Sequence, residues 1–253
     1  MKAVFISDAH LNGSACDGYR YLMRFLDSIR DGADELFIVG DFFDFWFSGS
    51  NSVYPGFYDI VEKLLEIKKS GTNVSFFEGN HDFFLGDYFA QYGIKVFPDG
   101  ATIDLDGKKL FVSHGDTVDD SNMAYLLWRR VLRSRLFYVI QKKIPSSILW
   151  RVSRIISRIS RSRGRGRGRG RSNSGRASHS NGLVPRMSTF AVGKFDKGFD
   201  AVVLGHCHRP TLERHVINNR LKTFAILGDW VRHYSYLVYD GGEFVMKRYH
   251  FIA

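Results

Sequence analysis

Short apolar runs alternate along the chain with longer amphipathic stretches. Five runs of four or five residues are rich in β-branched and aromatic side chains, as is typical of buried strands: 3–7, 36–39, 74–77, 110–113 and 201–204. Between the early runs, apolar residues recur at helical spacing over 21–29 and 58–67. This alternation predicts an α/β fold with a largely parallel sheet covered by helices on both faces.

A short polar motif follows nearly every one of these runs. In chain order the motifs are Asp8-Ala9-His10, Gly40-Asp41 with Asp44, Gly79-Asn80-His81-Asp82, His114-Gly115-Asp116 and Gly205-His206-Cys207-His208. Because parallel strands bring their carboxyl ends to the same edge of a sheet, we expect the five motifs to form one site.

The residue types in these motifs are those that hold a pair of divalent metal ions. We predict that Asp41 is the carboxylate that bridges the pair. The remaining ligands divide into one set for each ion: Asp8, His10 and His208, and Asn80, His114 and His206. Carboxylate, imidazole and amide ligands without thiolate suit Mn²⁺, Fe or Zn²⁺ in expanded coordination better than a closed structural zinc site. Such a pair acidifies a bound water and leaves positions open for phosphate oxygens.

His81 and Asp44 are predicted to be a catalytic pair beside the metals. The Asp44 carboxylate would accept a hydrogen bond from one ring nitrogen of His81. The other nitrogen would face the scissile phosphate, where it stabilises charge or protonates the leaving group. The alternative is that Asp44 only caps its loop. Cys207 stands between two predicted ligands, and alternation along an extended segment points it away from the metals into buried space.

The C-terminal part of the chain adds further predicted strands. They lie at 223–227, 236–239 and 243–249, and the turn sequence Asp240-Gly241-Gly242 joins the last two as a hairpin. Together with the first sheet, these strands predict two packed sheets with helices outside.

The ordered motifs resemble the signature of the calcineurin-like metallophosphoesterases, over residues 3–116 and 199–230. Within that group the chain is similar to the bacterial UDP-2,3-diacylglucosamine hydrolases. The likeness lies in residues 40–46, in 114–117 followed by Tyr125 and Arg129, and in a helical insertion before the last histidine pair. Many of those hydrolases carry an arginine where this chain has His81. The resemblance implies a four-layer α/β-β/α sandwich with a helical lid insertion.

The insertion divides the predicted catalytic domain into residues 1–120 and 187–253. Amphipathic helices are predicted at 125–140 and 146–159, and residues 121–162 would form a helical lid with an apolar underside. A plain helical hairpin packed on the core is the alternative. The Arg-, Gly- and Ser-rich segment 163–186 has no core-forming periodicity, so a disordered loop is predicted there.

The insertion also carries the positive charge of the protein. The net charge of the chain is +10, whereas residues 129–186 alone contain seventeen Lys or Arg and no Asp or Glu. A basic amphipathic segment favours contact with an anionic membrane surface. No aromatic residue interleaves the Arg-Gly run, so no dedicated nucleic-acid partner is expected. Two cysteines, no leader before the first strand and no apolar run of about 18 residues predict a cytoplasmic protein, peripherally associated with the inner membrane.

The leading interpretation, implied by the resemblance, is a hydrolase that cleaves the pyrophosphate of UDP-2,3-diacylglucosamine in lipid A biosynthesis. Substrate contacts are expected from Asn80, His81, Asn122, Tyr125, Arg129 and His206. Acyl chains are expected to lie against Phe137, Ile140, Ile148, Val152 and Ile156. A soluble metal-dependent phosphodiesterase or phosphatase acting on nucleotides is the alternative enzyme. An RNA-binding or membrane-tethering protein that acts through its Arg-Gly segment is the alternative of another class.

Overall fold

The structure is a computed structural model that describes residues 1–14, 17–47, 53–145, 147–152, 155 and 174–250. Its elements in the first half of the chain are β1 (Lys2–Ile6), α1 (Asp17–Ile29), β2 (Glu35–Val39), η1 (Pro55–Phe57), α2 (Tyr58–Lys69), β3 (Asn73–Phe77), α3 (Gly86–Phe89), η2 (Ala90–Tyr92), β4 (Lys95–Phe97), β5 (Ala101–Leu105) and β6 (Lys108–Ser113). The second half contains α4 (Met123–Leu132), α5 (Arg135–Lys143), α7 (Ser174–Phe195), β7 (Ala201–Leu204), β8 (Thr211–Ile217), β9 (Arg220–Ile226), β10 (Ser235–Asp240) and β11 (Glu243–Arg248).

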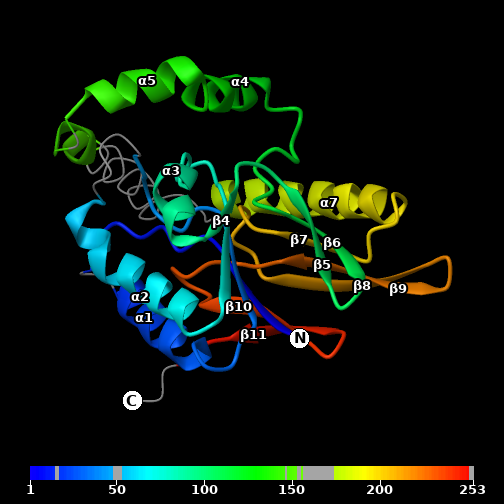
Figure 1. Cartoon of the computed structure of the whole chain (residues 1–253). Helices are drawn as coiled ribbons and strands as arrows, with labels where there is room; N and C mark the ends of the chain where they lie inside the picture. The colour runs from blue at the N-terminus through cyan, green and yellow to red at the C-terminus, as the bar shows by residue number, and fades with distance from the viewer. Residues whose placement is uncertain (15–16, 48–52, 146, 153–154, 156–173, 251–253) are drawn as a thin grey trace.

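The strands form two mixed sheets that pack face to face (Figure 1). The first has the order β11-β10-β1-β2-β3-β4, in which β1 to β4 are parallel and the C-terminal hairpin adds antiparallel to β1. The second has the order β5-β6-β7-β9-β8, with β6, β7 and β9 parallel. Because β1, β2, β3, β6 and β7 run parallel within their sheets, the loops at their carboxyl ends gather at one edge of the molecule.

Strict alternation along the strands builds four layers. In β1, Ala3 and Phe5 face the second sheet, whereas Val4 and Ile6 pack against α1 and α2. In β7, Val202 and Leu204 pack against the apolar face of α7, which includes Met187, Ala191 and Phe195. The order of layers is therefore helices, sheet, sheet, helix, which is the four-layer sandwich that the motifs implied.

The expectation of one largely parallel sheet with helices on both faces is wrong in its detail. Each sheet has helices on one face only and the other sheet on its second face. Strands β4, β5 and β8 were not predicted from the sequence. The first has only three residues, and the other two carry polar residues along exposed sheet edges, so neither forms an apolar run.

The insertion begins with two helices rather than the single predicted helix over 125–140. Helix α4 ends at Leu132, and α5 starts after Ser134, whose hydroxyl accepts a hydrogen bond from Phe137 N at 3.2 Å. Both helices lie apart from the sheets, on the far side of α3 (Figure 1). Of the predicted helix over 146–159, residues 147–152 and 155 are helical and the others lie outside the described residues.

Helix α7 was not predicted from the sequence. It begins at Ser174 and continues through Pro185, so residues 174–186 are helical and the prediction of a loop as far as 186 is wrong. Residues 163–173, with the Arg-Gly run, lie outside the described part of the chain. No helix in the described part is both long and apolar enough to cross a membrane.

Candidate metal centre

The polar motifs meet at the edge where the parallel strands end. Two groups of predicted ligands have their donor atoms within 4.8 Å of one another: Asp8, His10 and His208, and Asp41, His114 and His206. They come from the ends of β1, β2, β6 and β7, so both sheets contribute. The structure thus brings together the predicted Asp and His ligands of the two ions.

The first group presents one carboxylate oxygen and two ring nitrogens to a common point. His10 Nε2 and His208 Nε2 are 3.2 Å apart, and Asp8 Oδ1 is 3.5 Å from His208 Nε2 and 3.9 Å from His10 Nε2. Asp8 is fully buried, and within the described residues its Oδ1 takes part in no hydrogen bond. A buried acceptor without a donor, facing two imidazole nitrogens, fits a bound cation.

The second group is arranged around Asp41. Its Oδ2 atom lies 3.5 Å from His114 Nε2 and 3.8 Å from His10 Nε2 of the first group. Asn80 joins here, because its side-chain oxygen is 3.2 Å from His114 Nε2. One carboxylate oxygen therefore faces both groups, which is the position that a bridging ligand requires.

Contacts behind the ligands fix which ring nitrogen faces the centre. His114 Nδ1 lies 3.0 Å from the carbonyl oxygen of Val39, which leaves Nε2 for the centre. His208 Nδ1 faces the Asp229 carboxylate at 3.7 Å, and Asp229 is held by the backbone N–H groups of residues 231–233. Such outer contacts orient metal-binding histidines and raise their basicity.

The backbone of most predicted ligands adopts a strained left-handed conformation, which lowers the stability of the fold. Five of the seven predicted ligands have φ in the left-handed region: Asp8 at 54°, His10 at 45°, Asp41 at 51°, His206 at 68° and His208 at 55°. Each such non-glycine residue costs roughly 1 to 3 kcal/mol, and residues of this kind cluster at functional sites.

Asp82 locks two of the ligand loops together. Its buried carboxylate accepts hydrogen bonds from the backbone N–H groups of Asp41, Phe42, Phe43 and Gly79 at 2.7 to 3.1 Å. The loops are so close that a Cβ on Gly79 would lie 2.1 Å from Asp41 Oδ1. Glycine is therefore required before Asn80, and Asp82 supports the turn rather than serving as a ligand.

Burial and charge set the protonation of the imidazoles. Burial lowers the pKa of His10 to about 3 and that of His206 to about 4, so both rings are neutral at pH 7 and can offer a lone pair. Burial also disfavours charge on His114, but the Asp41 carboxylate outweighs it and raises the pKa of His114 to about 10. A cation bound beside Asp41 would displace that proton, as metal binding to histidine does.

The predicted pair of His81 and Asp44 is adjacent, but through different atoms than expected. His81 Nδ1 lies 3.2 Å from the backbone carbonyl oxygen of Asp44 and 3.7 Å from its carboxylate. The carboxylate is also 3.8 Å from His10 Nδ1, so it sits between the two rings. Burial lowers the pKa of His81, but Asp41 and Asp44 outweigh it and the net shift is upward. The ring stays 40% exposed, as a group that meets a substrate must.

The predicted substrate contacts on α4 are engaged by the protein itself. Tyr125 Oη and Arg129 Nε both donate to Asp116 Oδ2 at 2.7 Å, and Arg129 also reaches Asp99 at 2.9 Å. Asn122 caps α4, since its side-chain oxygen accepts from Tyr125 N at 3.2 Å. Sequence reasoning missed this network, although the spacing of Tyr125, Arg129 and Arg133 marks one polar edge of the helix.

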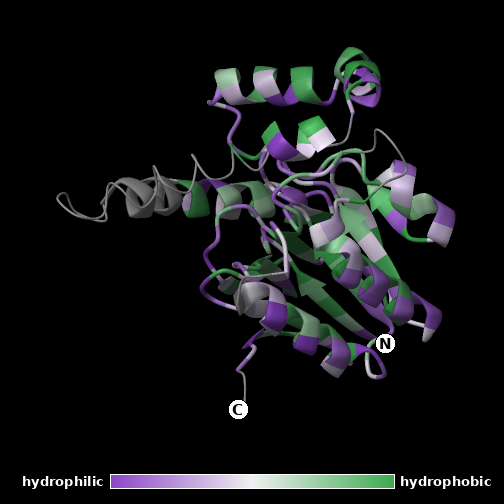
Figure 2. Cartoon of the chain, turned by 90° about the vertical axis from the view of Figure 1, so that its left-hand side faces the viewer, coloured by the Kyte–Doolittle hydropathy of each residue, from purple (hydrophilic) through white to green (hydrophobic). Residues whose placement is uncertain are grey.

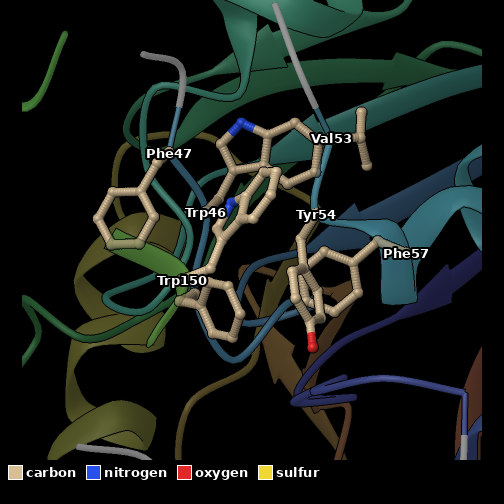
Figure 3. A pocket seen from close by; sticks show the side chains of 7 residues that line it. Trp46, Phe47, Val53, Tyr54, Phe57 and Trp150 are labelled. Carbon is tan, nitrogen blue, oxygen red and sulfur yellow. The ribbon is translucent and has the colours of Figure 1, made fainter. Parts of the chain in front are cut away.

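The described residues that were expected to line an acyl pocket do not enclose one. Ile140, Ile148 and Val152 each expose about half of their side chains, and Ile156 lies outside the described residues. An aromatic pocket lies instead between the insertion and the loop that follows β2 (Figure 3). Its first lining residues come directly after Asp44 in the sequence. Its lining residues are Phe45, Trp46, Phe47, Val53, Tyr54, Phe57 and Trp150.

Cys207 is confirmed as a buried filler. It is 7% exposed and packs with Leu204 and Met187 on the α7 side of the second sheet, away from the centre. Burial raises the pKa of its thiol to about 11, so the thiol is protonated at pH 7.

Comparison with known proteins agrees with this geometry. Residues 1–210 match the family model described as calcineurin-like phosphoesterase. Three curated relatives are each named UDP-2,3-diacylglucosamine hydrolase. That of Ectopseudomonas mendocina (strain ymp) is 28% identical and covers 95% of both chains. That of Stenotrophomonas maltophilia (strain K279a) is 30% identical and covers 96% of both, and that of Vibrio vulnificus (strain CMCP6) is 31% identical and covers 91% of this chain and 90% of the relative.

Proposed function

Because the chain belongs to the calcineurin-like phosphoesterase family and is a metal-dependent phosphoester hydrolase, we propose a specific reaction for it. It hydrolyses the pyrophosphate of UDP-2,3-diacylglucosamine to UMP and 2,3-diacylglucosamine 1-phosphate, a step of lipid A biosynthesis. The observation that carries the proposal is the pair of facing ligand groups with Asp41 between them. The relatives of that name, aligned over nearly the whole chain, supply the substrate.

The proposed metal ligands are Asp8, His10, Asp41, Asn80, His114, His206 and His208. Two divalent ions held there, proposed to be Mn²⁺, would polarise the phosphate and acidify water. Nitrogen and oxygen donors without thiolate support this choice over a structural zinc site. His81 would stand at the exposed side of the centre with its Nδ1 fixed by the Asp44 carbonyl, leaving Nε2 to donate to a phosphate or leaving-group oxygen.

The insertion is proposed to receive the lipid part of the substrate. The aromatic pocket brings Trp150 of the insertion against Tyr54, with ring centroids 5.6 Å apart, and its Phe45 and Trp46 follow Asp44 directly. These aromatic walls suit an acyl chain. A charge at Val152 should disturb the insertion less than the loss of Trp150, because Val152 is nearly half exposed.

Helix α4 supports peripheral contact with an anionic membrane. Its polar edge with Tyr125 and Arg129 points inward, whereas Leu127 and Trp128 are 65% and 60% exposed. Figure 2 shows hydrophobic segments on these outlying helices. Lys142 and Lys143 on α5 are exposed too, and apolar and basic side chains together fit a bilayer interface with anionic head groups.

Turnover of purified protein tests the proposed substrate. Metal-free enzyme should be inactive and should regain activity with Mn²⁺ on UDP-2,3-diacylglucosamine, with UMP and the lipid monophosphate as products by mass spectrometry. Trp150→Ala should raise KM for this substrate and leave hydrolysis of bis(p-nitrophenyl) phosphate unchanged. Faster turnover of UDP-N-acetylglucosamine or of a dinucleotide than of the acylated substrate would instead favour a soluble nucleotide phosphodiesterase.

A further inference from the structure

Arg133, at the C-terminal end of α4, joins the insertion to the loop that follows β3 through several hydrogen bonds. Its Nη2 donates to the carbonyl oxygen of Gly79 at 2.7 Å, and its Nη1 lies 3.2 Å from Glu78 Oε2 and also contacts the carbonyl oxygen of Pro98. The Arg133 side chain is 13% exposed and the Glu78 side chain 6%. The guanidinium thus binds the two residues that come directly before Asn80.

Further contacts fix the loop that Arg133 holds. Glu78 is fixed on its other side, since its Oε1 accepts from Leu85 N at 2.9 Å. Gly79 is wedged against Asp41, and Asn80 and His81 follow it toward the centre. A displacement of the Gly79 carbonyl would be passed directly to the Asn80 side chain, because one peptide bond joins them.

Arg129, one turn earlier on α4, makes the matching contact with the loop after β6. It donates to Asp116, two residues beyond His114. Both loops supply proposed ligands of the same ion, Asn80 and His114, whose side chains lie 3.2 Å apart. The polar edge of α4 therefore supports one metal position, whereas the group of Asp8, His10 and His208 receives no contact from α4 within the described residues.

We propose that Arg133 is a positioning residue that holds Asn80 in place for the second metal ion, so that the insertion completes the metal centre as well as contacting substrate. The effect on turnover rests on the proposed function, whereas the effect on metal binding does not. The guanidinium suits this role because it binds a carboxylate and a carbonyl at the same time in a fixed plane.

Calorimetric titration of the metal-free, full-length protein with Mn²⁺ tests the proposal. Arg133→Ala should weaken one of two binding events by roughly 10- to 100-fold, the usual effect of removing a contact behind a ligand, and leave the other unchanged. Arg133→Lys, which keeps the charge and one donor, should recover part of that loss. The matched control is Arg130→Ala, because Arg130 is exposed on the same helix.

Kinetics with bis(p-nitrophenyl) phosphate add a second readout. We expect kcat of Arg133→Ala to fall by roughly 10- to 100-fold with little change in KM, since the small diester does not reach the insertion. A folded Arg133→Ala protein that binds two Mn²⁺ ions with unchanged affinity would overturn the proposal, as would an equal loss in Arg130→Ala. If Arg133→Ala does not fold, Arg133→Gln decides by the same criteria. Absence of phosphoester hydrolysis by the unsubstituted protein would refute the proposed function, yet the titration would still decide the role of Arg133.

Discussion

Helices α2 and α4 are both amphipathic, but they bury opposite faces. Helix α2 covers the first sheet and buries Ile60, Val61, Leu64 and Ile67, with its charged residues outside. Helix α4 has no fully buried residue, turns its polar edge toward the ligand loops and exposes Leu127 and Trp128. The comparison teaches that an amphipathic pattern predicts two unlike faces but does not say which one is inside.

The difference has a physical cause in what each helix meets. A sheet presents an apolar surface, and burial of apolar area drives α2 onto it. The ligand loops present the carboxylates of Glu78 and Asp116, and the turn after β4 presents that of Asp99. These carboxylates attract Arg129 and Arg133 of α4. The apolar face of α4 is left outward, where only a membrane or another apolar partner can cover it.

The largest expected effect belongs to the catalytic domain. Asp41→Ala should lower turnover by more than about 10³-fold, a part of the 10⁶-fold or larger acceleration typical of enzymes. The reason is that Asp41 Oδ2 faces both ligand groups, so its loss disrupts two metal positions. Metal content by plasma mass spectrometry and turnover check this. Asp59→Ala on α2 is the control, and an Asp41→Ala protein with two metals and full activity would refute the assignment.

His81→Ala should lower turnover by roughly 10²- to 10⁴-fold, the range for a positioned acid or base, without loss of metal. The ring lies at the exposed side of the centre and belongs to neither the Asp8 group nor the Asp41 group, although His10, Asp44 and His81 form a third set of donor atoms within 4.8 Å of one another. Asp44→Asn should have a milder effect, because the backbone carbonyl that His81 contacts remains. His215→Ala, on β8, is the control. Loss of metal in His81→Ala would make His81 a ligand instead.

Matched leucine substitutions in the two helices sharpen the contrast in packing. Leu64→Ala in α2 should lower the free energy of unfolding by roughly 2 to 5 kcal/mol, because Leu64 is fully buried. Leu127→Ala in α4 should change it by less than about 0.5 kcal/mol, since Leu127 is 65% exposed. Urea denaturation followed by circular dichroism measures both. Equal losses would mean that α4 is packed as α2 is.

A smaller effect is expected at the outer face of the insertion. Trp128→Glu should weaken binding to anionic vesicles by roughly 10- to 100-fold, since burying a large side chain in the interface contributes roughly 1.5 to 3 kcal/mol. Tyr58→Glu is the control, because Tyr58 is an exposed aromatic residue on α2. Vesicle sedimentation gives the partition coefficients. If both variants bind vesicles as well as the unsubstituted protein does, the face of α4 serves something other than a membrane.

The sequence by itself was sufficient to predict the strand ends and the grouping of the candidate ligands. Each of these residues lies within four residues of the end of a strand, so local patterning and the parallel arrangement bring them to one edge. The structure groups Asp8, His10 and His208 as predicted, and it places His114, His206 and Asn80 beside Asp41, the predicted bridge. Their roles as ligands stay a prediction until metal is measured.

Only the tertiary structure decided how the two sheets share their faces and which side of α4 points inward. The polar edge strands β5 and β8 contain no apolar run that would predict them. The break between α4 and α5 depends on the Ser134 cap and on the ion pair of Arg133 with Glu78. The tertiary structure also decided which atom of Asp44 contacts His81. The backbone carbonyl oxygen of Asp44 lies closer to His81 Nδ1 than the expected carboxylate does. Contacts between segments 55 residues apart, such as Glu78 with Arg133, leave no periodic trace in a sequence, since either residue alone looks like an ordinary surface charge.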